Sequence, residues 1–155
     1  MVRVHQEEPI ENMKRIISLL LLLLPYYGFS QTIIYEDHLS WLGDDQRVAD
    51  YVDNYMPEDI TVYVIDGPVY RRHLAFVEVL PKKTYIITFS TNMSILEYLE
   101  SYVHEMVHIN QYHRGSLVKK GSYMIWEGKK YSILVPYSRR PWEQEAEFVA
   151  NRFIN

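Results

Sequence analysis

Cysteine is absent from all 155 residues of the chain. Its absence excludes a lipoprotein anchor, a thiol nucleophile and a zinc ion held by cysteine ligands. It also excludes disulfide bonds. An exported form of this chain would therefore depend for its stability on the packing of its core and on any metal that it binds.

An excess of basic charge is missing as well. The 16 lysine and arginine residues are outnumbered by 20 aspartate and glutamate residues, and the formal net charge is −4. Without a basic stripe, nucleic acid is not expected as the main partner. Internal repeats are also missing, and the length favours one domain.

A long apolar run is the third absence. The longest run, at residues 16–24, is too short to span a bilayer, which takes about 20 residues. It follows a basic segment at residues 13–15 and precedes a small-x-small pattern in which Gly28 and Ser30 are the small residues. This order is typical of a secretory signal peptide, with an uncleaved interfacial anchor as the alternative.

We therefore predict cleavage between Ser30 and Gln31 and an exported product, either periplasmic or secreted. The remaining residues 31–155 form one expected domain with no stable membrane span. Residues 1–12 precede a plausible initiator at Met13, so the leader is expected to begin at either methionine.

The hydrophobic pattern predicts an α+β fold. Apolar residues at helical spacing predict a helix over residues 40–55. Three β-rich runs, at residues 60–66, 73–80 and 84–90, predict a three-stranded, mainly antiparallel sheet.

The second half of the chain predicts a helix, a β-hairpin and a final helix. Ser94 and Glu97 form the capping box of the first of these helices, and Gly115 is a natural stop. A hairpin turn is expected at residues 127–129. Pro141 suits the first position of the last helix.

The stretch "HEMVH" carries the strongest chemical signal. His104 and His108 are four residues apart, so both imidazoles project from one side of a helix and can reach one tetrahedral zinc ion. Glu105 lies about 100° around that helix, where it can reach a water bound to the metal but cannot be a ligand. Two histidines on an ordinary helix surface are the alternative interpretation.

A third ligand would distinguish these interpretations. His113 does not fit the metzincin pattern, because Gln111 and Arg114 stand where that pattern needs glycine and histidine. His38 and His73 are isolated in the sequence, and we interpret both as structural or surface residues.

The acidic residues of the last helix supply the best candidate. Glu143 borders the expected buried face, and Glu147 lies one turn further along the same side, whereas Glu145 points elsewhere. A carboxylate beside a core needs a partner or a metal, so we predict Glu143 as the third ligand. Glu147 is then placed to accept the second N–H of a ligating histidine. An exposed acidic first turn, favoured by the helix dipole, is the alternative.

These two motifs together resemble those of the gluzincin zinc metallopeptidases. The matching residues are His104, Glu105 and His108 in HExxH and Glu143, Ala146 and Glu147 in ExxA[D/E]. Aspartate is commoner than glutamate at the position of Glu147. The small size is similar to that of single-domain minigluzincins, and Gln111 matches the HExxHxxQ form of small bacterial members. The resemblance spans about residues 84–153.

The resemblance implies a small zincin-like domain that hydrolyses peptide bonds with Zn²⁺. In such folds the strand before the metal helix, here residues 84–90, borders the cleft and pairs with an extended peptide. Glu105 would activate the zinc-bound water and then pass its proton to the leaving amine. The expected partner is therefore a peptide or protein substrate.

An electrophile for the developing oxyanion is also expected. Tyr137, Arg139 and Arg140 precede the helix of the third ligand and could overhang the metal. Tyr112 and Tyr131 are further candidates, and each of these residues also fits an ordinary structural role.

Two other functions fit the same residues. With about 125 residues after the predicted cleavage site, there is little room for a second subdomain beside the cleft. This favours a zinc-stabilised, catalytically silent peptide-binding module or a latent peptidase that needs a partner. A chance motif in a metal-free envelope protein is the remaining alternative. The presence of Glu105 and the lack of an apparent fourth ligand favour the enzyme.

Overall fold

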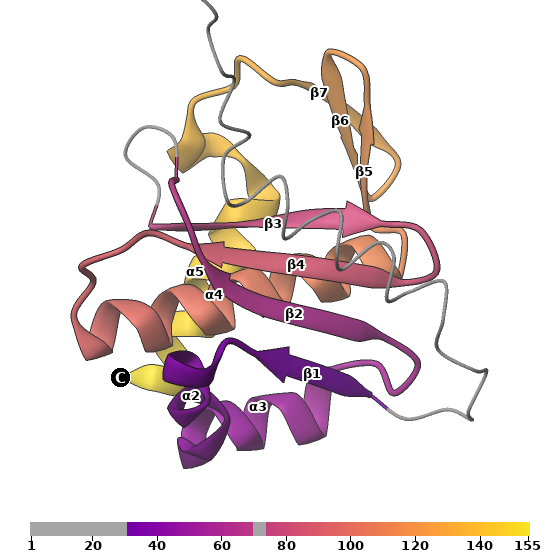
Figure 1. The fold of residues 1–155 in the computed structure, drawn as a ribbon. Coiled ribbons are helices and arrows are strands. Elements are labelled where there is room, and N and C mark those ends of the chain that lie inside the picture. Colours follow the sequence, from indigo (N-terminus) through magenta and orange to yellow (C-terminus); the bar gives the residue numbers. More distant parts are fainter. Residues whose placement is uncertain (1–30, 70–73) are drawn as a thin grey trace, which may run out of the picture.

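The computed structural model describes residues 31–69 and 74–155. The predicted signal peptide, residues 1–30, and His73 lie outside the described residues. The described part is an α+β fold with four α-helices and two sheets (Figure 1). Within it, none of the helices combines the length and the apolar composition needed to cross a membrane.

The first sheet has four strands in the order β1-β2-β4-β3. They are β1 (Thr32–Tyr35), β2 (Thr61–Asp66), β3 (Ala75–Leu80) and β4 (Thr84–Phe89). β1 and β4 both run parallel to β2, and only β3 is antiparallel to its neighbour β4. The prediction of a three-stranded, mainly antiparallel sheet is therefore wrong.

The reason lies in the connections between the strands. The four-residue strand β1 was not predicted, and a helical segment joins it to β2. A crossover of this kind returns the chain in the same direction, whereas a short turn such as residues 81–83 reverses it. The mixed sheet follows from having both kinds of connection.

The first predicted helix is two helices, α2 (Trp41–Asp44) and α3 (Gln46–Tyr55). Asp45 separates them because its backbone is extended and its side chain caps α3, accepting the N–H of Arg47 at 3.0 Å. An aspartate in this conformation is a preferred N-cap, so it begins a new helix instead of continuing the previous one.

The long helix α4 (Ile95–His113) carries the HExxH motif, and its predicted capping box is confirmed. The backbone N–H of Ser94 donates to Glu97 Oε2 at 2.7 Å, and that of Glu97 donates to Ser94 Oγ at 3.3 Å. These two bonds satisfy N–H groups that the first turn of a helix leaves free.

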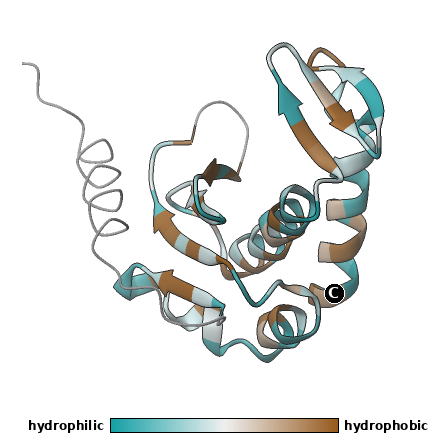
Figure 2. Ribbon diagram, turned by 90° about the vertical axis from the view of Figure 1, so that its right-hand side faces the viewer, coloured by the Kyte–Doolittle hydropathy of each residue, from teal (hydrophilic) through white to brown (hydrophobic). Residues whose placement is uncertain are grey.

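The main core lies between the first sheet and helices α3, α4 and α5 (Pro141–Ile154). Figure 2 shows α4 between the first sheet, on the left, and α5, on the right. Leu99, Tyr102, Val103 and Met106 of α4 are at most 1% exposed, so one face of this helix is wholly enclosed. Packing therefore fixes the rotation of α4 and the direction of its polar side chains.

The second sheet extends the predicted hairpin by one strand. It is an antiparallel meander of β5 (Leu117–Lys120), β6 (Tyr123–Trp126) and β7 (Lys129–Ser132). Glu127 and Gly128, between β6 and β7, both have positive φ, as a tight type I′ hairpin turn requires. The sheet packs on the first turn of α5, where Trp142 is buried. This contact holds the start of α5 in place.

Candidate metal centre

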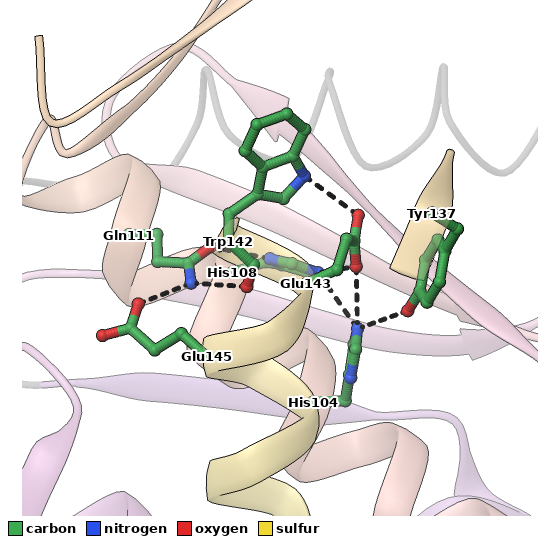
Figure 3. A network of polar contacts seen from close by, with 7 residues as sticks. All are labelled: His104, His108, Gln111, Tyr137, Trp142, Glu143 and Glu145. Carbon is green, nitrogen blue, oxygen red and sulfur yellow. Dashed lines mark hydrogen bonds and ion pairs between the residues drawn. The ribbon is translucent and has the colours of Figure 1, made fainter. Parts of the chain in front are cut away.

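Three side chains from α4 and α5 converge on one point (Figure 3). His104 Nε2 and His108 Nε2 are 3.1 Å apart, and Glu143 Oε2 lies 3.2 Å from the first and 3.0 Å from the second. The side chains are 16%, 9% and 12% exposed, respectively. His104, His108 and Glu143 therefore lie close enough to bind a metal ion.

Their spacing fits one small cation. Atoms bound at 2.0–2.1 Å to a tetrahedral zinc ion lie about 3.3 Å from each other. The three observed separations, 3.0 to 3.2 Å, are slightly smaller than this and nearly equal to one another. Two imidazole nitrogens and one carboxylate oxygen are also a donor set that zinc accepts.

Hydrogen atoms alone do not satisfy this triangle. Each of its three contacts needs one hydrogen, but only the two Nε2 atoms can supply one, since an ionised Glu143 is an acceptor. If both Nε2 atoms carry a hydrogen, two N–H groups face each other. If only one does, the lone pair of the other nitrogen faces the carboxylate. If neither does, two lone pairs face each other. A cation at the centre removes this conflict, because all three atoms then act as ligands.

The charges of the centre point the same way. Burial alone would raise the pKa of Glu143, but the hydrogen bonds from His104 and His108 outweigh it and hold that pKa well below the usual range. Burial alone would lower the pKa of His108, but the hydrogen bond to Glu143 and the charges of Glu105 and Glu143 raise it. The cluster thus favours a positive charge among its members, whether a proton or a metal ion.

Glu105 lies beside these groups and is 6% exposed. Burial raises the pKa of its carboxyl group, and the neighbouring histidines oppose that rise. A buried carboxylate with raised proton affinity is suited to taking a proton from a reacting group at neutral pH. Its side chain also lines the cavity that contains the three candidate ligands.

That cavity has a volume of about 670 Å³. Its walls come from β3, α4, α5, the first residue of β5 and the 3₁₀-helix η2 (Tyr137–Arg139). The candidate ligands and Glu105 are therefore accessible from a space that is large enough for part of a small ligand.

The strand beside this cavity is β3, not the predicted β4. Both edges of β4 are occupied, by β2 and by β3, so residues 84–90 cannot pair with an added strand. Among the described strands β3 pairs only with β4, and its residues Ala75 and Val77 line the cavity. The prediction took the strand that directly precedes α4 in sequence, which is β4. β3 comes before β4 in sequence but lies on the outer side of β4 in the sheet.

The edge of β3 opposite β4 carries a defined set of backbone groups. Ser90 N donates to Leu74 O at 2.8 Å, so this pair is hydrogen-bonded. Bonded and non-bonded pairs alternate in an antiparallel ladder, and therefore the N–H and C=O groups of Ala75 and Val77 point away from β4. No described strand pairs with these groups.

Of the predicted electrophiles, the structure brings Tyr137 to the centre. Its Oη lies 3.2 Å from His104 Nε2, and burial together with the charge of Glu143 raises the pKa of its hydroxyl group. Arg140 instead donates to the carbonyl oxygens of Ile133 and Val135, at 3.1 and 2.9 Å. Its guanidinium group therefore anchors the segment before η2.

The described part of the structure shows no hydrogen bond between the ligand atoms and the three remaining candidates for oxyanion stabilisation. Tyr112 lines the cavity, and burial raises its pKa to about 12. Tyr131 packs edge-on against Trp142, with ring centroids 5.6 Å apart, as part of the second sheet's core. Arg139 is the last residue of η2.

Glu147 does not take the position expected of it. It is exposed at the cavity wall, and among the described residues no hydrogen bond joins it to either histidine. The outer nitrogen of His108, Nδ1, is bonded instead to Gln111 Oε1 at 2.8 Å. Sequence reasoning missed this partner, although the i, i+3 spacing of His108 and Gln111 on one helix was a usable signal.

The histidines that were excluded as ligands lie elsewhere. His38 Nε2 is 2.7 Å from Asp66 Oδ2 at the end of β2. His113 Nε2 is 3.4 Å from Asp59 Oδ1. Neither belongs to the cluster of His104, His108 and Glu143.

No protein-family model, curated protein or solved structure matches this chain. The resemblance to gluzincins therefore stays a prediction that depends on the motifs, and the functional argument depends on the geometry of the centre.

Proposed function

We propose that this chain is an exported, zinc-dependent metallopeptidase. The observation that carries the proposal is the near-equilateral triangle of His104 Nε2, His108 Nε2 and Glu143 Oε2, with the buried carboxylate of Glu105 beside it. Three protein ligands, with one position left for water or substrate, are typical of catalytic zinc, whereas structural sites normally use four. Export is inferred from the leader-like order of residues 13–30.

The proposed chemistry assigns a separate role to each group. When bound, zinc supplies a Lewis acid that polarises a carbonyl oxygen and makes water more acidic. Glu105 accepts the proton of the attacking water and returns it to the leaving amine, a transfer that its burial and raised pKa favour. The Tyr137 hydroxyl group donates a hydrogen bond to the oxyanion that forms from the carbonyl oxygen of the substrate.

The proposed substrate is an extended peptide. Ala75 and Val77 present backbone donors and acceptors at the wall of the cavity that contains Glu105. A peptide paired with this edge gains affinity from main-chain hydrogen bonds, so its binding needs no particular side chain. The proposal therefore places the β-augmentation site on β3.

A direct test compares the zinc-loaded protein with its Glu105→Gln variant on a diverse peptide library, with fragments detected by mass spectrometry. Glu105→Gln preserves the size of the side chain and removes its basicity, so we expect it to retain zinc and lose cleavage. Cleavage by Glu105→Gln at the unaltered rate would contradict the proposal.

A latent peptidase or a silent peptide-binding module is the second candidate, and one observation favours it. Tyr137 Oη is as close to His104 Nε2 as the Glu143 ligand atom is, at 3.2 Å in both cases. A tyrosine at this distance could occupy the fourth position of the metal and exclude water from it. The experiment on Tyr137 in the Discussion separates the two functions.

A further inference from the structure

Gln111 is fully buried between α4 and α5 and has no access to water. Its side-chain amide makes three hydrogen bonds within the protein (Figure 3). Its Nε2 donates to Trp142 O at 3.0 Å and to Glu145 Oε2 at 2.7 Å, and its Oε1 faces His108 Nδ1 at 2.8 Å.

The partners of the amide determine its orientation. A backbone carbonyl and a carboxylate are both acceptors, so the amide atom that faces them has to be the NH₂ group, and its two hydrogens are both used. The opposite orientation would place the amide oxygen against two other oxygens. Oε1 therefore faces His108, and it can only accept a hydrogen.

This orientation fixes the tautomer of His108. An acceptor at 2.8 Å from Nδ1 requires that Nδ1 carries a hydrogen. In neutral His108 the other ring nitrogen, Nε2, then has a free lone pair. Nε2 is the atom that faces His104 and Glu143, so the amide prepares His108 to bind a metal through that nitrogen.

Glu145 is itself held in place. Arg114, at the C-terminal end of α4, donates from Nη2 to both carboxylate oxygens, at 3.1 and 3.2 Å. This contact keeps the carboxylate of Glu145 directed at Gln111, on the side of α5 away from the candidate metal (Figure 3). A contact chain of Arg114, Glu145 and Gln111 thus reaches from the surface to His108.

We propose that Gln111, oriented by Glu145, is a positioning residue that holds His108 in the tautomer whose Nε2 binds the metal. The inference depends on the metal-binding part of the proposed function and does not require that the protein cleaves peptides. It also differs from a purely structural role, since a structural glutamine would join α4 to α5 without affecting the hydrogen on His108.

The first test replaces Gln111 with methionine, which has a similar shape and no amide. Losing an outer-shell partner of a ligating histidine typically weakens metal binding by about 10–100-fold, and we expect a loss in this range for zinc, measured by competition with a chelator. In the metal-free protein, long-range ¹H–¹⁵N NMR should show a hydrogen on Nδ1 of His108 in the wild type, because Gln111 Oε1 accepts it, in addition to any hydrogen that Nε2 donates to Glu143. In Gln111→Met we expect a mixture of tautomers.

Gln46→Met is the matched control, because Gln46 is an exposed residue of α3 and bonds only to Asp50 within the described residues. We expect wild-type zinc affinity and the wild-type tautomer in this variant. If Gln111→Met had the zinc affinity and the His108 tautomer of the control, the proposal would be overturned.

A second variant keeps the test decisive if Gln111→Met does not fold. Glu145 has a side chain that is 37% exposed, so Glu145→Ala should be tolerated. It removes one of the two acceptors that orient the amide, and we expect a smaller loss of zinc affinity than in Gln111→Met. Glu58→Ala, at another exposed acid, is its control, and equal affinities in these two variants would refute the role of Glu145.

These measurements separate two kinds of failure. If peptide cleavage is absent but zinc affinity depends on Gln111, the proposed peptidase function fails and the positioning role stands. If the wild type cleaves peptides but replacing Gln111 leaves the zinc affinity unchanged, the peptidase function stands and the positioning role fails. The tautomer is read in metal-free protein, so it tests the positioning role even if zinc does not bind.

Discussion

His104 supplies one corner of the ligand triangle, and its Nε2 is within 3.2 Å of both other ligand atoms. His104→Ala leaves one imidazole and one carboxylate, which is a weaker and less specific donor set for zinc. We expect the variant to lose most of its zinc after a zinc-replete preparation, as measured by inductively coupled plasma mass spectrometry. Glu105→Gln is the control and should keep its zinc.

Replacing Tyr137 distinguishes an active peptidase from a latent one, because peptide cleavage should fall in the first case and rise in the second. Tyr137→Phe removes only the hydroxyl group that lies near His104. If this group donates to the oxyanion, its loss should lower kcat by about 10²–10³-fold, with zinc content unchanged. If it blocks the fourth position instead, the same variant should cleave peptides faster than the wild type.

Residue-level prediction succeeded where one helix or one turn controls the outcome. His104 and His108 are on one face of α4 because residues four apart always are. Glu143 lies in the first turn of α5, which begins at Pro141 as predicted. The structure gives different partners from those predicted for Glu147 and Arg140. Gln111, not Glu147, is bonded to His108 Nδ1, and Arg140 donates to backbone carbonyl oxygens. These contacts depend on neighbours that are distant in sequence.

The strand β3 is the element whose edge is proposed to bind a peptide. Val77→Pro removes one N–H that points away from β4, and proline is tolerated at such an edge because no ladder bond is lost. We expect a higher KM for peptides with little change in stability.

Val79→Pro is the matched control, because Val79 has the same orientation on β3 but does not line the cavity. Its KM should stay near that of the wild type. Equal KM values in Val77→Pro and Val79→Pro would contradict peptide binding at this edge.

The start of α4 offers a separate test of the fold. Ser94→Ala removes the hydroxyl group that accepts the N–H of Glu97, a change that typically costs about 1 kcal/mol of stability. We expect a corresponding decrease in the free energy of unfolding, measured with urea. Zinc affinity should be unchanged, because the cap is more than two turns from His104; a large loss of zinc affinity would argue that the whole helix shifts.

The elements show where local patterns suffice. The capping box at Ser94 and the turn at Glu127-Gly128 were recognised because each is formed by residues within a few positions of each other. β1 was missed because four residues carry little periodicity, and α2 was merged with α3 because Asp45 fits a helix surface as well as a cap.

For the whole molecule, metal binding should be coupled to stability. His104 and His108 belong to α4 and Glu143 belongs to α5, so an ion bound by all three would join two helices that are remote in sequence. A ligand that binds only the folded state stabilises it by about 2.7 kcal/mol at a concentration of 100 times Kd. We therefore expect chelation to lower Tm and added zinc to restore it, as measured by calorimetry.

His104→Ala is the control for this effect, since its Tm should no longer respond to chelation or to zinc. Magnesium should not replace zinc, because it prefers oxygen ligands in octahedral geometry. A Tm of the wild type that is indifferent to both chelator and zinc would count against a metal centre in this protein.

The sequence by itself determined the features that depend on short separations along the chain: the paired imidazoles of α4, the adjacent carboxylate of Glu105, the helix caps and the hairpin turn. Their geometry follows from backbone periodicity, which needs no distant partner. Only the tertiary structure decided that β3 is the edge strand beside the cavity in the described sheet, that Gln111 faces His108 and that Glu143 completes the triangle. These contacts depend on how α4, α5 and the sheet pack, and packing is a property of all the buried side chains together.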